Sequence, residues 1–163
     1  MSHKNRTLRL TNHPWKMSLF LLWKLPLGFL ARLRVDKMTM EKASVSLPYN
    51  YINKNPFRSI YFAALSMAAE LSTGILAIAH VEKSSVPVSM LIFGVRAEFV
   101  KKAKNRITFT CNQGELLEKT IAQSIAENEG RVCEVFSEGV DSEGDVVARF
   151  WFTWTFKPKK NDA

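Results

Sequence analysis

Cysteine, glycine and proline are scarce in this sequence. Its 163 residues include two cysteines, seven glycines and six prolines, while 47% are hydrophobic and 23% are charged. These proportions exclude a collagen-like or disordered chain and are typical of one globular domain that can bury a core. Cys111 and Cys133 form no CxxC pair and have no histidine at ligand spacing, which argues against a metal site. Two cysteines do not make a disulfide scaffold, so we expect free thiols in a reducing compartment, the cytoplasm.

The sequence also lacks a long uninterrupted apolar run. Residues 12–34, NHPWKMSLFLLWKLPLGFLARLR, are interrupted by Lys24 and Pro26, and no small-residue cleavage site follows. We therefore expect neither a targeting signal nor a membrane-spanning helix here. The pattern predicts a helix over about 15–23, a break at the proline and another turn or two. Packing at the domain edge, a lid over an apolar site and peripheral contact of residues 15–33 with a membrane surface all remain open.

Negative charge is scarce near the N-terminus. Residues 1–42 hold nine Lys and Arg against two acidic residues, so +7 of the formal net charge of +8 lies there. A second basic cluster, KKAKNR, comprises Lys101, Lys102, Lys104 and Arg106. This cluster is either a solvated loop or a site that attracts a phosphate-bearing ligand, an acidic carrier protein or anionic lipid. Because no zinc-finger, helix-turn-helix or aromatic RNA-binding pattern accompanies the charge, we do not expect a nucleic-acid partner.

The remaining periodicity predicts an α+β domain, with an antiparallel sheet and one helix that is apolar nearly all round. We expect the basic helical segment to occupy residues 1–34 and the domain to occupy 35–163. The predicted strands cover 38–47 (with a bulge near residues 41–42), 86–99, 105–111, 131–140 and 145–157. Helices are predicted over about 55–79 and 114–128, and Asn55 is the expected N-cap of the first.

Glu70 is the one carboxylate in the predicted helix 55–79. At 100° per residue one narrow stripe holds Ser59, Ala63, Ser66, Glu70, Thr73 and Ala77. Small side chains around a carboxylate indicate the wall of a cleft that something else occupies, since a core helix would gain by placing leucine there. Burial of an unpaired, ionised Glu costs several kcal/mol, so we expect Glu70 to be paired, protonated or at a wet site. A catalytic carboxylate and a structural ion pair are both open.

The order of these elements resembles the hotdog-fold thioesterases, above all the acyl-CoA thioesterases of the phenylacetate-pathway type. In those enzymes a loop Asn precedes the helix, the catalytic Asp or Glu follows fifteen residues later, and a Ser or Thr often follows one turn on. Asn55, Glu70 and Thr73 have these spacings, and the segment around the DSEG turn resembles the closing hairpin. The likeness covers about residues 35–157.

The sequence departs from this family in two places. Where these enzymes usually carry a Gly-Gly pair at the helix start, this chain has Phe62, Ala63 and Ala64. The predicted helix at 114–128 also stands between strands that such domains often join by a shorter turn. A divergent family is therefore expected.

The resemblance implies a hotdog fold, with an antiparallel sheet wrapped around a long helix, and hydrolysis of acyl-CoA or acyl-carrier thioesters. Glu70 would be the nucleophile or general base, and Asn55 would orient the water or the carbonyl unless it only caps the helix. The implied substrate-binding residues are Ser59, Phe62, Ala63, Ser66 and Thr73. The thioester carbonyl would lie near the N-terminal amides of the helix.

The basic cluster Lys101, Lys102, Lys104 and Arg106 would bind the phosphates of coenzyme A, which enters as part of the substrate, with no further cofactor. A homodimer or a dimer of dimers is also implied. The alternative is a non-catalytic acyl-binding, lipid-binding or membrane-associated protein of the same fold, since the missing Gly-Gly pair could mark lost catalysis.

Overall fold

Six strands form one antiparallel sheet in the order β1-β2-β4-β5-β6-β3 in the computed structural model, which describes residues 6–11 and 13–159. The strands are β1 (Arg34–Met38), β2 (Ala43–Leu47), β3 (Val88–Phe99), β4 (Ile107–Cys111), β5 (Arg131–Val140) and β6 (Val146–Pro158). The helices are α1 (Arg6–Thr11), α2 (Pro14–Lys24), α3 (Pro26–Leu30), α4 (Phe62–Lys83) and α5 (Gly114–Glu127). Residues 1–5 and 12 of the predicted N-terminal segment, and 160–163 of the predicted domain, lie outside the described residues.

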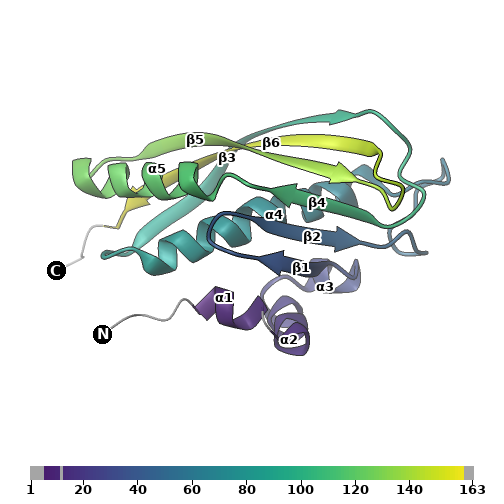
Figure 1. Ribbon diagram of the computed structural model, residues 1–163, viewed down its shortest axis with the longest axis horizontal. Coiled ribbons are helices and arrows are strands. Elements are labelled where there is room, and N and C mark those ends of the chain that lie inside the picture. Colours follow the sequence, from purple (N-terminus) through teal and green to yellow (C-terminus); the bar gives the residue numbers. More distant parts are fainter. Residues whose placement is uncertain (1–5, 12, 160–163) are drawn as a thin grey trace.

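The long helix α4 lies along the sheet and packs against β2, β4, β5 and β6 (Figure 1). Alternate residues of β6 point their aromatic rings into the core, where Phe150, Phe152 and Phe156 are all buried. The hydroxyls of Ser72 on α4 and Ser137 on β5 bond each other at 2.7 Å, so these buried polar groups are satisfied. The predicted α+β class, with an antiparallel sheet against one long central helix, is confirmed.

Among the described helices, α4 alone is long and apolar enough to cross a membrane by length and composition. However, 67% of its apolar window is buried inside the molecule, and the core helix of a globular domain meets the same criteria. We therefore regard α4 as the core helix of this fold.

Two predicted boundaries are wrong. The single bulged strand over 38–47 is a hairpin of β1 and β2, because the Thr39 hydroxyl accepts hydrogen bonds from the amides of Glu41 and Lys42 and turns the chain. The helix predicted to begin at Asn55 begins at Phe62 and ends at Lys83 instead of about Ala79. Its predicted start fails because residues 55–60 form a loop that is tied to the chain at Ala103, whose carbonyl accepts a bond from the Ile60 amide.

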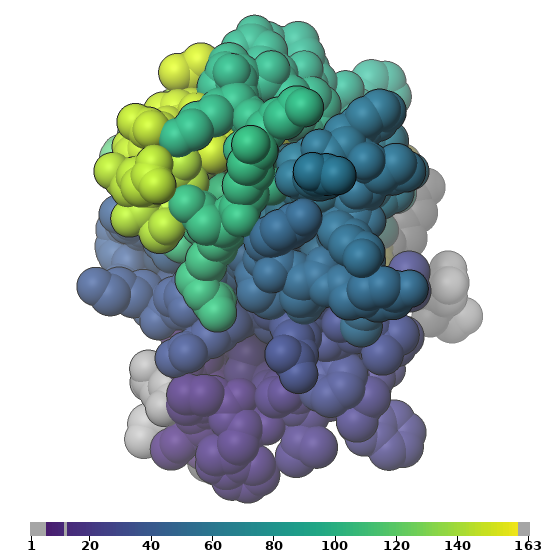
Figure 2. Space-filling view, turned by 90° about the vertical axis from the view of Figure 1, so that its right-hand side faces the viewer, coloured from purple at the N-terminus to yellow at the C-terminus, as the bar shows by residue number. Residues whose placement is uncertain are grey.

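The N-terminal helices α1–α3 lie together beside β1, at one edge of the sheet (Figure 1). The predicted helix over 15–23, its break and the further turn are confirmed by α2 and α3, between which Leu25 leaves the helical conformation. In the space-filling view this segment forms one end of the molecule (Figure 2). It therefore meets the domain through one side and presents the other to solvent.

Candidate active site

Glu70 lies halfway along α4 and is half-buried. Burial raises the pKa of its carboxyl above the ordinary value, because desolvation disfavours the charged form. Within the described residues no hydrogen bond or ion pair reaches the carboxylate. A structural ion pair of Glu70, one of the two alternatives from the sequence, is thus absent among the described residues. A desolvated, unpaired carboxylate is common at functional sites.

The next turn of α4 leaves room for this carboxylate. A Cβ atom added to Gly74 would lie 2.8 Å from Glu70 Oε1 and 3.4 Å from the ring of Trp154, so the carboxylate occupies the space of the missing side chain. Trp154 on β6 is held there because its indole N–H donates to Thr73 Oγ1 at 3.1 Å. The Thr73 hydroxyl donates in turn to the Glu70 carbonyl at 2.9 Å. Helix and sheet thus fix the wall against which Glu70 lies.

Only part of the predicted stripe is present. Ala63, Ser66 and Glu70 lie on the half-exposed side of α4, whereas Thr73 is fully buried and Ser59 precedes the helix. The Ser66 hydroxyl donates to the carbonyl of Phe62, one turn back, at 3.0 Å. The open side of the helix therefore ends at Glu70.

Asn55 and Ser59 lie in the loop before α4. The Asn55 side-chain oxygen accepts bonds from the amides of Phe57 and Ser59 and from the Ser59 hydroxyl, while its amide donates to the Ile60 carbonyl. Asn55 thus stabilises its own loop, and within the described residues no bond joins it to Glu70.

A pocket of about 580 Å³ opens at the start of α4. Its lining includes Asn55, Ser59, Phe62, Lys101 and Lys102. Several of the predicted binding residues thus lie around one pocket. Glu70 lies eight residues beyond Phe62, about 12 Å farther along the helix axis at a rise of about 1.5 Å per residue.

The basic cluster is divided. Lys101 forms ion pairs with Asp141, Glu143 and Asp145 at 2.8, 3.6 and 2.5 Å. The Asp141 hydrogen bond is the main cause that raises the pKa of the Lys101 ammonium. These three carboxylates lie close enough to hold a metal ion, but Lys101 already supplies their cation. Lys101 is therefore engaged in a structural contact.

The other members of the cluster point to different surroundings. Arg106 donates to the Ser46 hydroxyl at 3.2 Å and lines a pocket with β1 and β2 residues. Lys102 lines the pocket at the start of α4, and both Lys102 and Lys104 are exposed. The four cations thus do not form one binding site in this chain.

Comparison with known families gives one match over most of the chain. The model of a family described as a domain of unknown function, DUF4442, matches residues 14–156. The chain belongs to this family. The DUF4442 match includes α2 and α3 as well as the sheet, and no curated protein matches the sequence.

Solved structures identify the fold of this DUF4442 chain. A Pseudomonas aeruginosa protein of unknown function, described as a probable thioesterase, is similar at a TM-score of 0.75 and 18% identity over 90% of this chain and 97% of that one. A thioesterase from Haemophilus influenzae has a TM-score of 0.65 at 10% identity, covering 89% and 92%. A thioesterase family protein from Silicibacter pomeroyi has a TM-score of 0.64 at 12% identity, covering 89% and 98%. The predicted hotdog fold is confirmed.

Sequence reasoning missed two members of the site, Gly74 and Trp154. Gly74 carried a usable signal, because a glycine one turn after a helical carboxylate marks a close approach to the backbone. Trp154 lies in another element, and its contact with Thr73 depends on the register of β6 against the helix.

Proposed function

We propose that this protein hydrolyses acyl thioesters and that Glu70 is its catalytic carboxylate. The observation that carries the proposal is the half-buried Glu70 carboxylate, which burial desolvates and which no described residue pairs. The shared fold with proteins called thioesterases supports the class of reaction.

The chemistry follows from the carboxylate. Ionised Glu70 would attack the thioester carbonyl, and the thiolate would leave as a mixed anhydride forms; water then releases the acid and restores Glu70. Alternatively, Glu70 would take a proton from water as that water attacks the carbonyl. Thr73 and Trp154 are positioning residues in either route, because they fix the wall against which the carboxylate lies.

One chain does not bring Glu70 and the start of α4 together. The resemblance implies that the carbonyl lies near the N-terminal amides of α4, but the first four of these lie about 8 to 12 Å along the axis from Glu70 in the same helix. One carbonyl cannot contact both. We propose that the N-terminus of α4 from a partner subunit meets Glu70 in a homodimer, as sites shared between subunits in the resembling thioesterases imply.

Coenzyme A is the carrier that the proposal favours. Within the described residues Lys102 and Lys104 make no ion pair and can attract its phosphates, whereas Lys101 is neutralised by carboxylates and Arg106 lines another pocket. The pocket at the start of α4, which Lys102 lines, would hold the adjoining part of the carrier.

A second function has one observation in its favour. Phe62 stands where the resembling enzymes have glycine, and its ring packs edge-on against Tyr61 and Phe99 at the helix start. A bulky side chain there restricts access to the backbone amide, which favours a non-catalytic acyl-binding protein.

An acyl-CoA panel separates the two functions. Short, aromatic and long acyl-CoAs would be offered to the full chain, with free thiol measured for hydrolysis and calorimetry measured for binding. Thiol release that depends on the enzyme supports hydrolysis, and preference for the aromatic acyl group supports the phenylacetate type. Binding without thiol release would assign the second function, and neither binding nor release would contradict both.

A further inference from the structure

Helix α2 has two apolar faces, and the described part of the chain covers one of them. Met17 and Leu21 are buried against the rest of the chain. On the other side four apolar side chains are exposed, namely Trp15 (63%), Leu19 (49%), Leu22 (44%) and Trp23 (83%). At 100° per residue these four fall within an arc of about 100°, so they form one continuous stripe. Leu27 and Leu30 of α3 are also exposed, by 67% and 54%.

Cations lie on both sides of this stripe. On one side a hollow of about 330 Å³ is lined by Arg6, Arg9 and Lys16, together with Leu10 and His13. On the other, a pocket of about 640 Å³ begins at Ser18, which neighbours Leu22 on the helical wheel.

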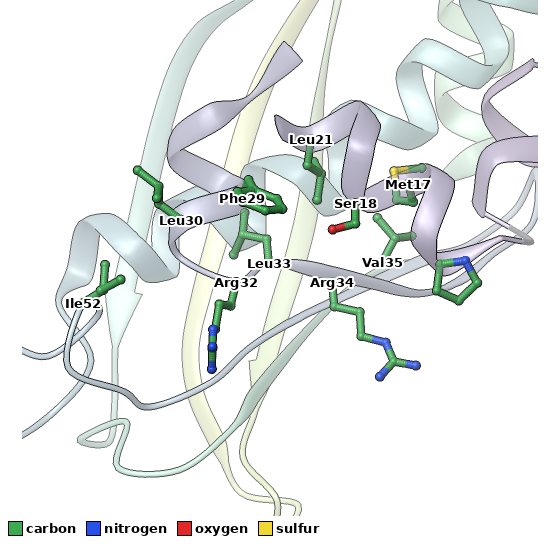
Figure 3. Close-up of a pocket in the computed structure, with 11 residues that line it drawn as sticks. Met17, Ser18, Leu21, Phe29, Leu30, Arg32, Leu33, Arg34, Val35 and Ile52 are labelled. Atoms are coloured by element: carbon green, nitrogen blue, oxygen red, sulfur yellow. The ribbon is translucent and has the colours of Figure 1, made fainter. Parts of the chain in front are cut away.

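This second pocket has an apolar interior and a basic rim. Figure 3 shows Met17 and Leu21 on one side of the pocket, and Arg32 and Arg34 extending on the opposite side. Its apolar lining and its arginines suit an apolar chain beside an anionic group.

Carboxylates are few around α1–α3: Asp36 pairs with Arg34 at 3.4 Å, and Glu82 of α4 accepts bonds from the amide and hydroxyl of Thr7. The first 35 residues include seven Lys and Arg and no Asp or Glu. We propose that the α2–α3 face docks onto the surface of an anionic phospholipid bilayer, with Trp15 and Trp23 inserted at the headgroup level. Tryptophan prefers that depth because its ring is apolar and its N–H is polar, and basic side chains around an apolar helix face bind anionic lipid.

The charge argues against a second copy of the chain as the occupant. Two such faces brought together would oppose two strongly basic segments, because α1–α3 contain no Asp or Glu, and like charges repel. An anionic bilayer offers an apolar interior to the exposed stripe and negative headgroups to the cations beside it. The inference stands apart from the thioesterase proposal, because it concerns other residues and another ligand.

Co-sedimentation of the full chain with vesicles tests it. We expect the protein to pellet with vesicles of phosphatidylcholine mixed with phosphatidylglycerol, to remain in solution with phosphatidylcholine alone, and to be released by salt. Arg9→Glu with Lys16→Glu, which reverses two cations of the hollow beside the stripe, should lower partition by at least about tenfold, because each cation near such a surface contributes about 1 kcal/mol. Lys119→Glu with Lys157→Glu makes the same change in net charge on α5 and β6 and should retain binding.

A separate pair of variants tests the apolar stripe. Trp15→Ala with Trp23→Ala should also lose partition, and thermal melts would show that each variant is folded. In the unaltered chain, brominated lipid should quench tryptophan fluorescence, and Trp15→Phe with Trp23→Phe should remove that quenching.

Several results would overturn the inference. Wild-type protein that stays in solution with anionic vesicles at low salt would do so, as would equal losses in the two charge-reversed variants. A change of oligomeric size in Trp15→Ala with Trp23→Ala, with vesicle binding intact, would assign the face to a second copy.

Discussion

Glu70 owes its proposed reactivity to the side chains that surround it. The helix places it on a side where neighbours are small, and Gly74 leaves its carboxylate a place against the Trp154 ring. A carboxylate held in this way is desolvated yet open to one side, which suits a nucleophile or base. The spacing in the sequence predicted Glu70 as the residue to test. That it lacks a partner was not predictable, because any distant Lys or Arg could have reached it.

The raised pKa of Glu70 makes a prediction about stability. The folded state keeps the Glu70 proton at pH values where the unfolded chain has released it, so the free energy of unfolding falls as pH rises through that window. The stabilisation from protonated Glu70 is fully present below the ordinary Glu pKa and is lost as the pH rises through the raised pKa of the folded state. Glu70→Gln should therefore become more stable relative to wild type as pH rises from acid to neutral. Denaturant titrations across pH measure this, with exposed Glu134→Gln as the control; a pH-independent difference would contradict it.

Gly74→Ala tests the space beside the carboxylate. The added methyl group would lie 2.8 Å from Glu70 Oε1, so the flexible carboxylate must move. We expect thioester turnover to fall on the order of ten- to a hundredfold, since small misplacements of reacting groups are costly. Thermal stability should be retained, because alanine favours helix over glycine by about 1 kcal/mol. Gly130→Ala, whose new methyl group would meet only Lys157 at 4.0 Å, is the matched control; equal turnover in both variants would refute this geometry.

At the scale of elements, period and composition predicted most of the sheet. Strands β3 to β6 and helix α5 follow from alternation, from the i, i+4 pattern and from turn residues. The two wrong boundaries lie where a side chain forms hydrogen bonds with backbone groups in place of the predicted secondary structure. Asn55-Pro56 has the composition of a helix start, yet Asn55 bonds its own loop and the chain turns again before α4 begins. Thr39 in the same way converts an expected bulge into a turn.

The basic cluster makes a prediction at this scale, because its members differ in their contacts. Lys101→Gln should lower the melting temperature, since it removes the cation from Asp141, whose carboxylate is buried and also accepts the amides of Glu143 and Asp145. Lys102→Gln with Lys104→Gln should leave the melting temperature unchanged and raise KM for acyl-CoA, more at low salt. Lys119→Gln is the control for a lost surface charge. A rise in KM for Lys101→Gln with no loss of stability would reverse this assignment.

For the whole molecule, the sequence predicted a sheet around one helix and, through resemblance, a fold that comparisons with solved structures confirm. It did not predict how the sheet ends. β3 is the last strand in the sheet order, and Leu91, Phe93 and Val95 along it are exposed by 65%, 78% and 61%. Strand order depends on long-range pairing, which local periodicity does not encode.

We expect this edge to pair with a second copy. An open apolar edge strand attracts another strand, and a symmetric pair would close both edges. Light scattering should give twice the 18.6 kDa of one chain, or more. Phe93→Lys with Val95→Lys should yield monomer and lose thioester turnover, whereas Val132→Lys on β5 should do neither. A wild-type monomer at micromolar concentration would contradict both the assembly and the shared site.

The most direct test of the central claim is Glu70→Gln, assayed for turnover and for thermal melting on the same preparation. The amide keeps the volume of the side chain but cannot act as nucleophile or base, so thioester turnover should fall by about 10²-fold or more. Because no described residue pairs with the carboxylate, the melting temperature at neutral pH should stay the same or rise. Retained turnover would show that Glu70 is not the catalytic carboxylate. So would a large loss of stability, which would reveal a buried cation that had been paired with Glu70.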